Sequence, residues 1–475
     1  MPKFLTLLCA TLLFASHLGA QEHPYVPDPD PLVRQNLEDW QDLKFGFMMH
    51  WGAYSQWGVV ESWSLCSEDW INRKGASYTD YVRRYGQLPK TFNPEKFDPQ
   101  RWAAAAWNAG MRYVVFTTKH HDGFCMFESK YTDYKITGSD CAFRNNPKAD
   151  VTRHIFDAFR EKGFKTGAYF SKPDWHCDDY WAPEWATPNR CNNYDIRKYP
   201  QRWKRYEDFT FNQISELMTS YGKVDILWLD GGWVRPDSTI TEEVLSWGYD
   251  LPKWGQAIDM HRIARMARQY QPGILIVDRS VHGPYENYRT PEQQVPDRTL
   301  PYPWETCMTM AGGWSYSFNP NYKSTHQLVH TLVDIVAKGG NFLLNVGPSP
   351  DGELDPQAYD RLREIGDWMR VNGEAIYGTR PIAPFKEGKV CLTQKKEGKT
   401  LYALYLADED ERTIPSRIWI STLTLPKQAK VELLGSRPVM LKWEPVGRGF
   451  WVEIPEALRK TPPCEHAWVL KISLK

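Results

Sequence analysis

The sequence lacks an excess of charge of either sign. Its 58 lysine and arginine residues balance 58 aspartate and glutamate residues, so the formal net charge is zero. Nucleic acids and acidic membrane surfaces are attracted by a field of positive charge, which this chain does not have overall. We therefore expect a neutral partner and no nucleic-acid ligand.

The cysteines lack the spacing of a structural zinc site. None of the nine forms a C-x-x-C pair, and Cys9 lies in the N-terminal apolar run. If the chain is exported, disulfides are permitted, and Cys177 and Cys191 could then close one loop. Their pairing does not follow from spacing alone.

Long hydrophobic runs are also missing, except at the N-terminus. Lys3 is followed by FLTLLCATLLFASHLGA, which ends at Ala20. A positive start, a short apolar run and a small residue at the end are typical of a secretory signal peptide. The run is short for a membrane span. We predict a signal peptide over residues 1–20 and an exported protein, periplasmic or secreted, or lysosomal if the source is eukaryotic.

Aromatic residues, in contrast, are abundant, with 22 Trp, 25 Tyr and 20 Phe. Flat rings stack on the apolar C–H faces of sugars, and they also fill large cores. The high tryptophan content favours a neutral carbohydrate as the partner, while many of these rings belong to the core in either case.

Short apolar runs alternate with helical patterns from about residue 44 to 375. Such runs suit parallel strands that are buried on both faces. The runs are KFGFMMH, YVVFTT, KTGAYFS, VDILWLD, ILIVD and NFLLNV. At this length the alternation predicts an α/β fold, a (β/α)8-like (TIM-type) barrel. A doubly wound open sheet is the alternative, but no glycine-rich phosphate loop follows the first run.

Helical segments between these runs carry terminal signals. Asp98 and Asp150 are predicted N-caps, and Pro99 suits a first turn. Further helices are expected over 206–221, 256–270, 325–338 and 356–371. After Tyr377 the pattern changes to short alternating stretches, which indicate antiparallel strands. We predict a barrel domain over 21–377 and a β-sandwich domain over 378–475.

Polar clusters follow the predicted strands, where barrel enzymes place their catalytic groups. They are His50-Trp51, Lys119-His120-His121-Asp122, Asp174-Trp175-His176, Asp230-Gly231-Gly232-Trp233 and Asp278-Arg279. Asp230 is either a helix N-cap or a nucleophile at a pocket floor, where its carboxylate could attack an anomeric carbon. A retaining glycosidase needs a second carboxyl group. Glu286 and Glu292 are the candidates, and either could instead be a solvated loop charge.

The adjacent histidines His120 and His121 have two interpretations. Neighbouring side chains diverge on an extended backbone, so they rarely share one metal ion, and no further spacing completes a ligand set. Neutral imidazoles instead offer one hydrogen-bond donor and one acceptor each, which suits sugar hydroxyls. We expect no metal site.

Several long strings together resemble the α-L-fucosidases of glycoside hydrolase family 29. They span about Asp42 to Tyr377. The strings are KFGFMMHWGAYS, YVVFTTKHHDGF, TGAYFS, VDILWLDGGW, VDRS, PWET, GGWSY, AKGGNFLLNVGPSPDG and NGEAIYG. The resemblance implies a catalytic barrel followed by a β-sandwich, with no metal or organic cofactor.

The resemblance also implies roles for individual residues. Asp230 corresponds to the nucleophile and Glu292, in TPEQ, to the acid/base, with Glu286 in reserve. The implied substrate-binding residues are His50, Glu61, Trp63, His120, His121, Trp233, Arg279 and Trp314. The segment GVVESWSLCSEDW departs from the common pattern, so Glu68 and Trp70 compete with Glu61 and Trp63.

The implied function is a retaining, exo-acting α-L-fucosidase that acts on fucosylated oligosaccharides or glycoconjugates. The 6-methyl of fucose requires an apolar wall, and its hydroxyls require paired donors and acceptors. The alternatives are a fucose-binding, lectin-like protein without turnover and an α-L-galactosidase.

Overall fold

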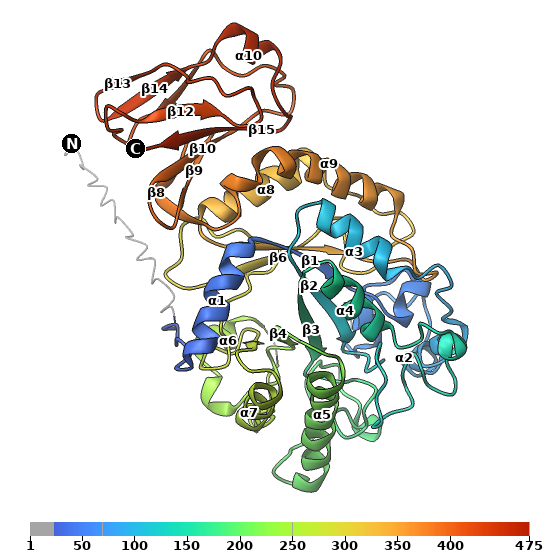
Figure 1. Cartoon of the computed structure of the whole chain (residues 1–475). Coiled ribbons are helices and arrows are strands. Elements are labelled where there is room, and N and C mark those ends of the chain that lie inside the picture. The colour runs from blue at the N-terminus through green and yellow to red at the C-terminus, as the bar shows by residue number, and fades with distance from the viewer. Residues whose placement is uncertain (1–22, 69, 249, 475) are drawn as a thin grey trace, which may run out of the picture.

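The computed structural model describes residues 23–68, 70–248 and 250–474 (Figure 1). The predicted signal peptide, residues 1–20, therefore lies outside the described residues. Within the described ranges, no helix combines the length and apolar character that a membrane crossing requires.

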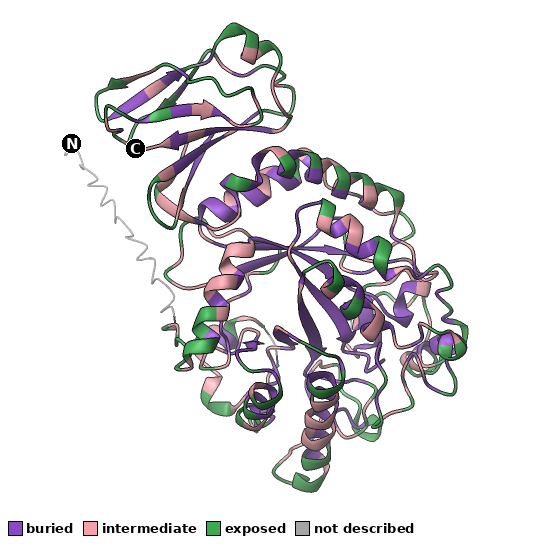
Figure 2. Cartoon of the chain, in the orientation of Figure 1, coloured by how far each residue is buried: buried purple, intermediate pink, exposed green. Residues whose placement is uncertain are grey.

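The larger part of the chain forms a curled parallel sheet surrounded by helices (Figure 1). The spatial order of the strands is β5-β4-β3-β2-β1-β7-β6. They are β1 Phe45–Met49, β2 Tyr113–Lys119, β3 Lys165–Ser171, β4 Ile226–Asp230, β5 Leu275–Asp278, β6 Glu305–Thr309 and β7 Asn341–Val346. Figure 2 shows the strands buried, which explains their continuous apolar runs.

An irregular segment, residues 285–293, completes the wall between the edge strands β5 and β6. On one side the backbone N–H of Asn287 donates to Ile276 O of β5 at 2.9 Å. On the other side the N–H of Gln293 donates to Cys307 O of β6 at 2.9 Å. The segment stands where an eighth strand would, and the predicted barrel-type fold is confirmed. Both candidate glutamates, 286 and 292, lie in this segment.

Strand β6 was not predicted, because several of its buried residues are polar. Glu305 accepts hydrogen bonds from Tyr113 Oη at 2.7 Å and from Trp228 Nε1 at 3.2 Å. Glu305 and Thr306 are fully buried. These partners lie on other strands of the barrel, so the local sequence gives no sign that a carboxyl group can be satisfied there.

The helices cover the outer face of the sheet, and their capping follows the sequence signals. Asp98 accepts from Arg101 N and Asp150 from Arg153 N, as predicted. The helices are α1 Pro31–Leu43, α2 Tyr78–Tyr85, α3 Pro99–Asn108, α4 Val151–Glu161, α5 Pro200–Ser220, α6 Glu242–Ser246, α7 Met260–Tyr270, α8 Thr325–Ala337, α9 Pro356–Asn372 and α10 Glu456–Lys460. The expected helices between the strands are therefore present, with small differences at their ends.

The C-terminal part forms two antiparallel sheets, of order β12-β15-β10-β9-β8 and β11-β14-β13. Their strands are β8 Thr379–Glu387, β9 Val390–Lys395, β10 Thr400–Leu406, β11 Arg417–Ile420, β12 Lys430–Leu433, β13 Trp443–Val446, β14 Gly449–Glu453 and β15 Ala467–Ser473. Strands β8 and β13 were not predicted, since both are largely half-buried or exposed. The two antiparallel sheets confirm the predicted C-terminal β-sandwich fold.

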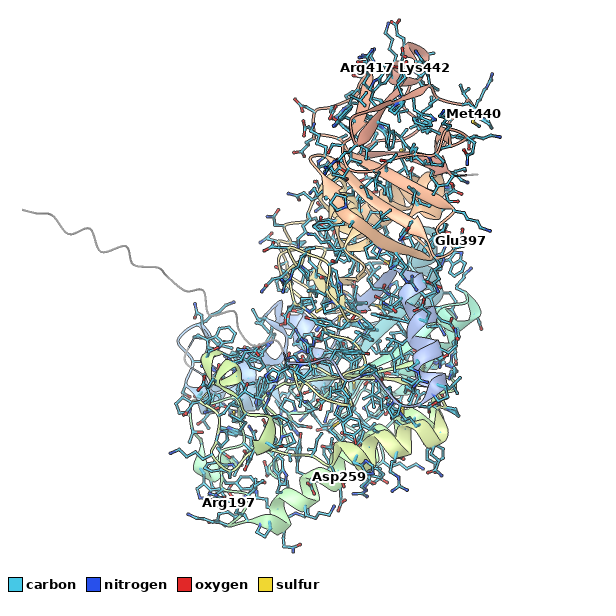
Figure 3. The ribbon with its side chains drawn as sticks, turned by 90° about the vertical axis from the view of Figure 1, so that its left-hand side faces the viewer. Arg197, Asp259, Glu397, Arg417, Met440 and Lys442 are labelled. Atoms are coloured by element: carbon cyan, nitrogen blue, oxygen red, sulfur yellow. The ribbon has the colours of Figure 1, made fainter. Side chains whose placement is uncertain are left out.

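The β-sandwich packs against helices α8 and α9 of the barrel (Figure 1). Trp368 Nε1 of α9 donates to Ala467 O of β15 at 3.0 Å, and both residues are buried. In Figure 3 the labelled Arg417, Met440 and Lys442 lie at the end of the molecule opposite Arg197 and Asp259. The sandwich thus packs onto the helical shell of the barrel.

The buried Glu305 gives the fold a testable dependence on pH. Burial raises the pKa of Glu305 to about 7, whereas an unfolded glutamate titrates near about 4.3. The folded state then favours the neutral form, so this residue's contribution is fully present below the unfolded pKa and is lost as pH rises to about 7. We expect Glu305→Gln, which stays neutral, to remove this loss.

Chemical denaturation of the wild type and of Glu305→Gln at several pH values measures the difference in their free energies of unfolding. Relative to the variant, the wild type should lose on the order of 3 kcal/mol of unfolding free energy between pH about 4.5 and 7. A difference that stays constant with pH would contradict the assignment of a neutral Glu305.

Candidate active site

A pocket of about 740 Å³ opens at the carboxyl ends of the barrel strands. It contains every predicted site residue except Glu286. These residues are His50, Glu61, Trp63, His120, His121, Asp230, Trp233, Arg279, Glu292 and Trp314. The parallel strands explain this convergence, because all their carboxyl ends meet at the same face of the barrel.

Asp230 is the last residue of β4 and lies in the wall of the pocket. Its Oδ2 accepts a hydrogen bond from Tyr169 Oη at 2.8 Å, and its Oδ1 accepts one from Gly231 N at 2.8 Å. Arg279 Nη1 lies 3.0 Å from Oδ1. The carboxylate is thus held in one orientation by a phenol, a backbone amide and a guanidinium.

These partners decide the charge state of Asp230. Burial alone would raise its pKa, but the positive charge of Arg279 and the hydrogen bonds from Tyr169 and Gly231 outweigh it. The pKa of Asp230 is therefore lowered, and the group is a carboxylate at neutral pH. An ionised carboxylate is the form that a nucleophile needs.

Glu292 lies at the same pocket and is joined to Asp230 through Arg279. Arg279 Nη2 forms an ion pair with Glu292 Oε2, while Nη1 contacts Asp230. Trp314 Nε1 donates to Glu292 Oε1 at 3.2 Å. One planar guanidinium therefore spans the two carboxylates, so they lie close together across the pocket. The Glu292 side chain is 41 % exposed, which gives it room to turn toward a ligand.

Glu286 is placed differently and does not line this pocket. It is 4 % exposed, accepts from Ser280 N at 3.0 Å and lies 2.7 Å from His282 Nδ1. It holds the loop after β5 rather than facing Asp230. Of the two glutamates suggested by the sequence, the structure brings only Glu292 to the same pocket as Asp230.

Three histidines line the pocket in a neutral state. Burial lowers the pKa of His50 and of His121 to about 4, and it lowers the pKa of His120 well below its usual range. Each ring uses Nδ1 for a protein contact. His50 Nδ1 lies 2.8 Å from Asn345 Oδ1. His120 Nδ1 lies 2.6 Å from Ser62 Oγ, and His121 Nδ1 lies 2.7 Å from Ser171 Oγ.

These contacts set the tautomer of two of the rings. Asn345 Nδ2 donates to Trp314 O, so its Oδ1 accepts from His50 Nδ1. Ser171 Oγ donates to Pro173 O, so it accepts from His121 Nδ1. A neutral imidazole that donates through Nδ1 keeps an acceptor at Nε2. His50 and His121 therefore offer acceptors suited to hydroxyl groups.

Glu61 lies at the wall shared with a neighbouring hollow. It is 2 % exposed, and its Oε1 accepts from Ser315 N at 2.8 Å. Burial raises its pKa to about 7, although the hydrogen bonds from Ser315 act in the opposite direction. The competing pair is placed elsewhere: Glu68 pairs with Arg190, and Trp70 is 58 % exposed.

Tyr169 and Arg190 are among the pocket residues that were not assigned a role from the sequence. Tyr169 lies within the string TGAYFS and points inward to Asp230. Arg190 follows no strand. Its guanidinium lies 4.7 Å from the ring of Trp63 and 5.4 Å from that of Trp233. Inward alternation along β3 could have indicated Tyr169, but no local signal marks Arg190, which reaches the pocket from a long loop.

His120, His121 and Asp230 are close enough to hold a metal ion, with candidate atoms within 4.8 Å of one another. The site's charges argue against this use. Arg279 already neutralises Asp230, and a second cation there would be repelled by the guanidinium. Among the described residues Cys177 and Cys191 are free thiols, so the suggested disulfide is not formed.

A barrel with two carboxylates, neutral histidines and aromatic walls at its mouth has the arrangement of a glycoside hydrolase. The model of the α-L-fucosidase family matches residues 12–374, and that of the α-L-fucosidase C-terminal domain matches residues 385–473. The chain therefore belongs to the α-L-fucosidases, which the sequence strings identified as glycoside hydrolase family 29. It is an enzyme of this class, a glycoside hydrolase.

Individual relatives agree with this membership over nearly the whole chain. An α-L-fucosidase of Branchiostoma floridae is 29 % identical, covering 97 % of this chain and 98 % of its own. Isoenzyme 1 from Paenibacillus thiaminolyticus has a TM-score of 0.72 at 30 % identity, covering 94 % and 100 %. The α-fucosidase of Thermotoga maritima, solved with fucose, has a TM-score of 0.71 at 28 % identity, with the same coverage.

The charge of Arg279 yields a prediction for the pH profile. Arg279→Gln removes the positive charge that favours the carboxylate form of Asp230. The acidic limb of kcat/KM for α-L-fucosyl fluoride should then move up by roughly 1–3 pH units, the usual effect of losing an adjacent opposite charge. Tyr169→Phe removes only a neutral hydrogen bond and should move that limb less. Equal shifts, or none, would contradict the role of Arg279.

Proposed function

We propose that this chain is a retaining, exo-acting α-L-fucosidase that removes terminal α-L-fucose from glycans by double displacement. Asp230 is the nucleophile and Glu292 the acid/base. The observation that carries the proposal is the guanidinium of Arg279, which touches both carboxylates at one pocket. Two carboxyl groups bridged by one guanidinium lie close together, and the retaining mechanism needs closely spaced carboxyl groups, at about 5–5.5 Å.

In the first step Asp230 attacks the anomeric carbon. Glu292 gives its proton to the glycosidic oxygen, the bond between that oxygen and the anomeric carbon breaks, and an ester forms between fucose and Asp230. In the second step Glu292 takes a proton from water, which attacks the same carbon and releases Asp230 as a carboxylate. Two inversions retain the configuration.

Arg279 balances the charges through both steps. When Asp230 becomes an ester it loses its negative charge, and in the same step Glu292 gains one by giving up its proton. Because the guanidinium contacts both groups, it faces one negative charge before and after the step. No charge is left unpaired in the pocket, which would be costly at this depth.

The pocket walls favour fucose as the sugar. The Nε2 acceptors of His50 and His121 suit hydroxyl groups, while Trp228 and Cys307, both 1 % exposed, give the pocket an apolar floor for a methyl group. A closed floor admits only a terminal residue, which supports exo action. The Thermotoga maritima relative, solved with fucose, supports the same sugar. Turnover of α-L-galactosides comparable with fucosides would shift the assignment to an α-L-galactosidase.

A fucose-binding protein without turnover is the second candidate named by the sequence. That interpretation required that no glutamate approach Asp230, whereas Glu292 shares its pocket and its arginine. Catalysis is therefore favoured over binding alone. Export remains a prediction from residues 1–20.

A set of three variants tests these roles. Asp230→Gly should lower turnover of fucosylated oligosaccharides by roughly 10⁴-fold or more. Glu292→Gln should cost about 10²–10⁴-fold on the same substrates, where the leaving oxygen needs a proton, and much less on α-L-fucosyl fluoride. Retained turnover in Asp230→Gly, or an equal loss by Glu292→Gln on both substrates, would overturn the mechanism.

Glu286→Gln is the matched control for Glu292→Gln. It changes the neighbouring carboxyl group of the same segment, but one that supports the loop. We expect a lower melting temperature and an unchanged kcat on both substrates, because Glu286 contacts Ser280 and His282 and lines the adjoining hollow rather than the pocket that holds Asp230. A loss of kcat confined to the oligosaccharide would make Glu286 the acid/base, whereas a change in KM alone would not.

A further inference from the structure

Two side hollows adjoin the pocket that holds Asp230. The first, of about 440 Å³, shares only Glu61 and Trp314 with the pocket. Glu61 is 2 % exposed and fixed to Ser315, so these two side chains stand as a wall between the spaces. The second, here called the Trp247 hollow, has a volume of about 430 Å³. It shares Glu243, Trp247, Ser280, Thr290, Pro291 and Gln294 with the pocket, so it adjoins the pocket along a longer edge than the first hollow does.

The position of Glu292 selects the second hollow as the place for the leaving group. An acid must stand beside the oxygen that it protonates, and that oxygen joins fucose to the leaving group. The residues around Glu292 in the chain, Pro291 and Gln294, line both the pocket and the Trp247 hollow. A saccharide joined to the oxygen beside Glu292 would therefore lie next to this hollow.

The lining of the Trp247 hollow suits a sugar ring. Trp247 offers a half-buried aromatic face, and the amide of Gln294 and the imidazole of His23 offer polar groups. Rings of this kind stack on the C–H faces of sugars while the polar groups take the hydroxyls. The volume lies within the roughly 300–1,000 Å³ of small-molecule sites.

The Trp247 ring is held in place before any ligand arrives. The guanidinium of Arg235 lies 5.0 Å from the ring centre. Arg235 is 2 % exposed, and its Nη1 donates to Thr239 O at 3.0 Å. A ring supported by a fixed cation loses little freedom on binding, which favours affinity.

We propose that the Trp247 hollow is the leaving-group site and that Trp247 determines the preference of this enzyme for fucose attached to a saccharide. The inference rests on the proposed function and adds the substrate class. It assigns Trp247 to substrate binding on the leaving-group side, while fucose itself occupies the pocket around Asp230.

The test compares two substrates that share the fucosyl group. A panel of fucosylated trisaccharides identifies the best substrate, and α-L-fucosyl fluoride serves as the reference, because fluoride makes no contact with the hollow. Trp247→Ala should lower kcat/KM for the trisaccharide by roughly tenfold to 100-fold, chiefly through KM. For the fluoride, kcat/KM should fall far less than for the trisaccharide. Trp247→Phe, which keeps a ring, should recover most of the loss.

Trp419→Ala is the matched control, since Trp419 is 46 % exposed on β11 of the β-sandwich. This variant should change kcat/KM for neither substrate. Equal losses on trisaccharide and fluoride in Trp247→Ala would show that Trp247 acts on the catalytic groups, and no loss on the trisaccharide would place the leaving group elsewhere. Either result overturns the inference.

Failure of the proposed function gives a different result. If the wild type turns over neither substrate, calorimetry with the trisaccharide and with free fucose replaces kinetics. Trp247→Ala should then weaken the binding of the trisaccharide by the same factor and leave the binding of fucose unchanged. Equal weakening of both ligands, or of neither, overturns the site independently of catalysis.

Discussion

The negative charge of Asp230, taken out of water at the end of β4, is the constraint around which the site is arranged. Burying a lone carboxylate costs several kcal/mol or is avoided by protonation. Here Arg279, Tyr169 Oη and Gly231 N satisfy it and keep it charged. Arg279 directly follows β5, and β5 pairs with β4. Its guanidinium can therefore reach Asp230 at the same edge of the sheet. The charge state of Asp230 therefore depends on the parallel register of the sheet.

The wall between β5 and β6 has a second effect on the chemistry. An irregular segment takes the place of an eighth strand, held by backbone hydrogen bonds on both sides. It presents Glu292 to the pocket and turns Glu286 into the loop that it supports. A regular strand would send alternate residues inward and outward along its length. The departure from regularity places the carboxyl group of Glu292 at the pocket, where it pairs with Arg279.

The neutral histidines complete this arrangement without adding charge. Burial keeps His50, His120 and His121 uncharged, so Arg279 remains the cation that sets the state of the two carboxylates. Asn345 and Ser171 fix the direction of the hydrogen bonds at His50 and His121 and leave their Nε2 atoms as acceptors. In the proposed mechanism, recognition and catalysis use separate groups, so hydroxyl contacts would persist while charge moves between Asp230 and Glu292.

The sequence by itself determined the strand runs, the helix caps and the order of polar strand ends, because these depend on residues near one another in the chain. It also carried strings long enough to identify the family. The three-dimensional structure was needed to show that Glu292 and not Glu286 lines the pocket with Asp230, to place Tyr169 and Arg190 there, and to reveal β6 with its buried Glu305. Each of these depends on a partner far along the chain, Arg279, Asp230, Trp63 or Tyr113, and contacts of that kind exist only once the barrel has closed.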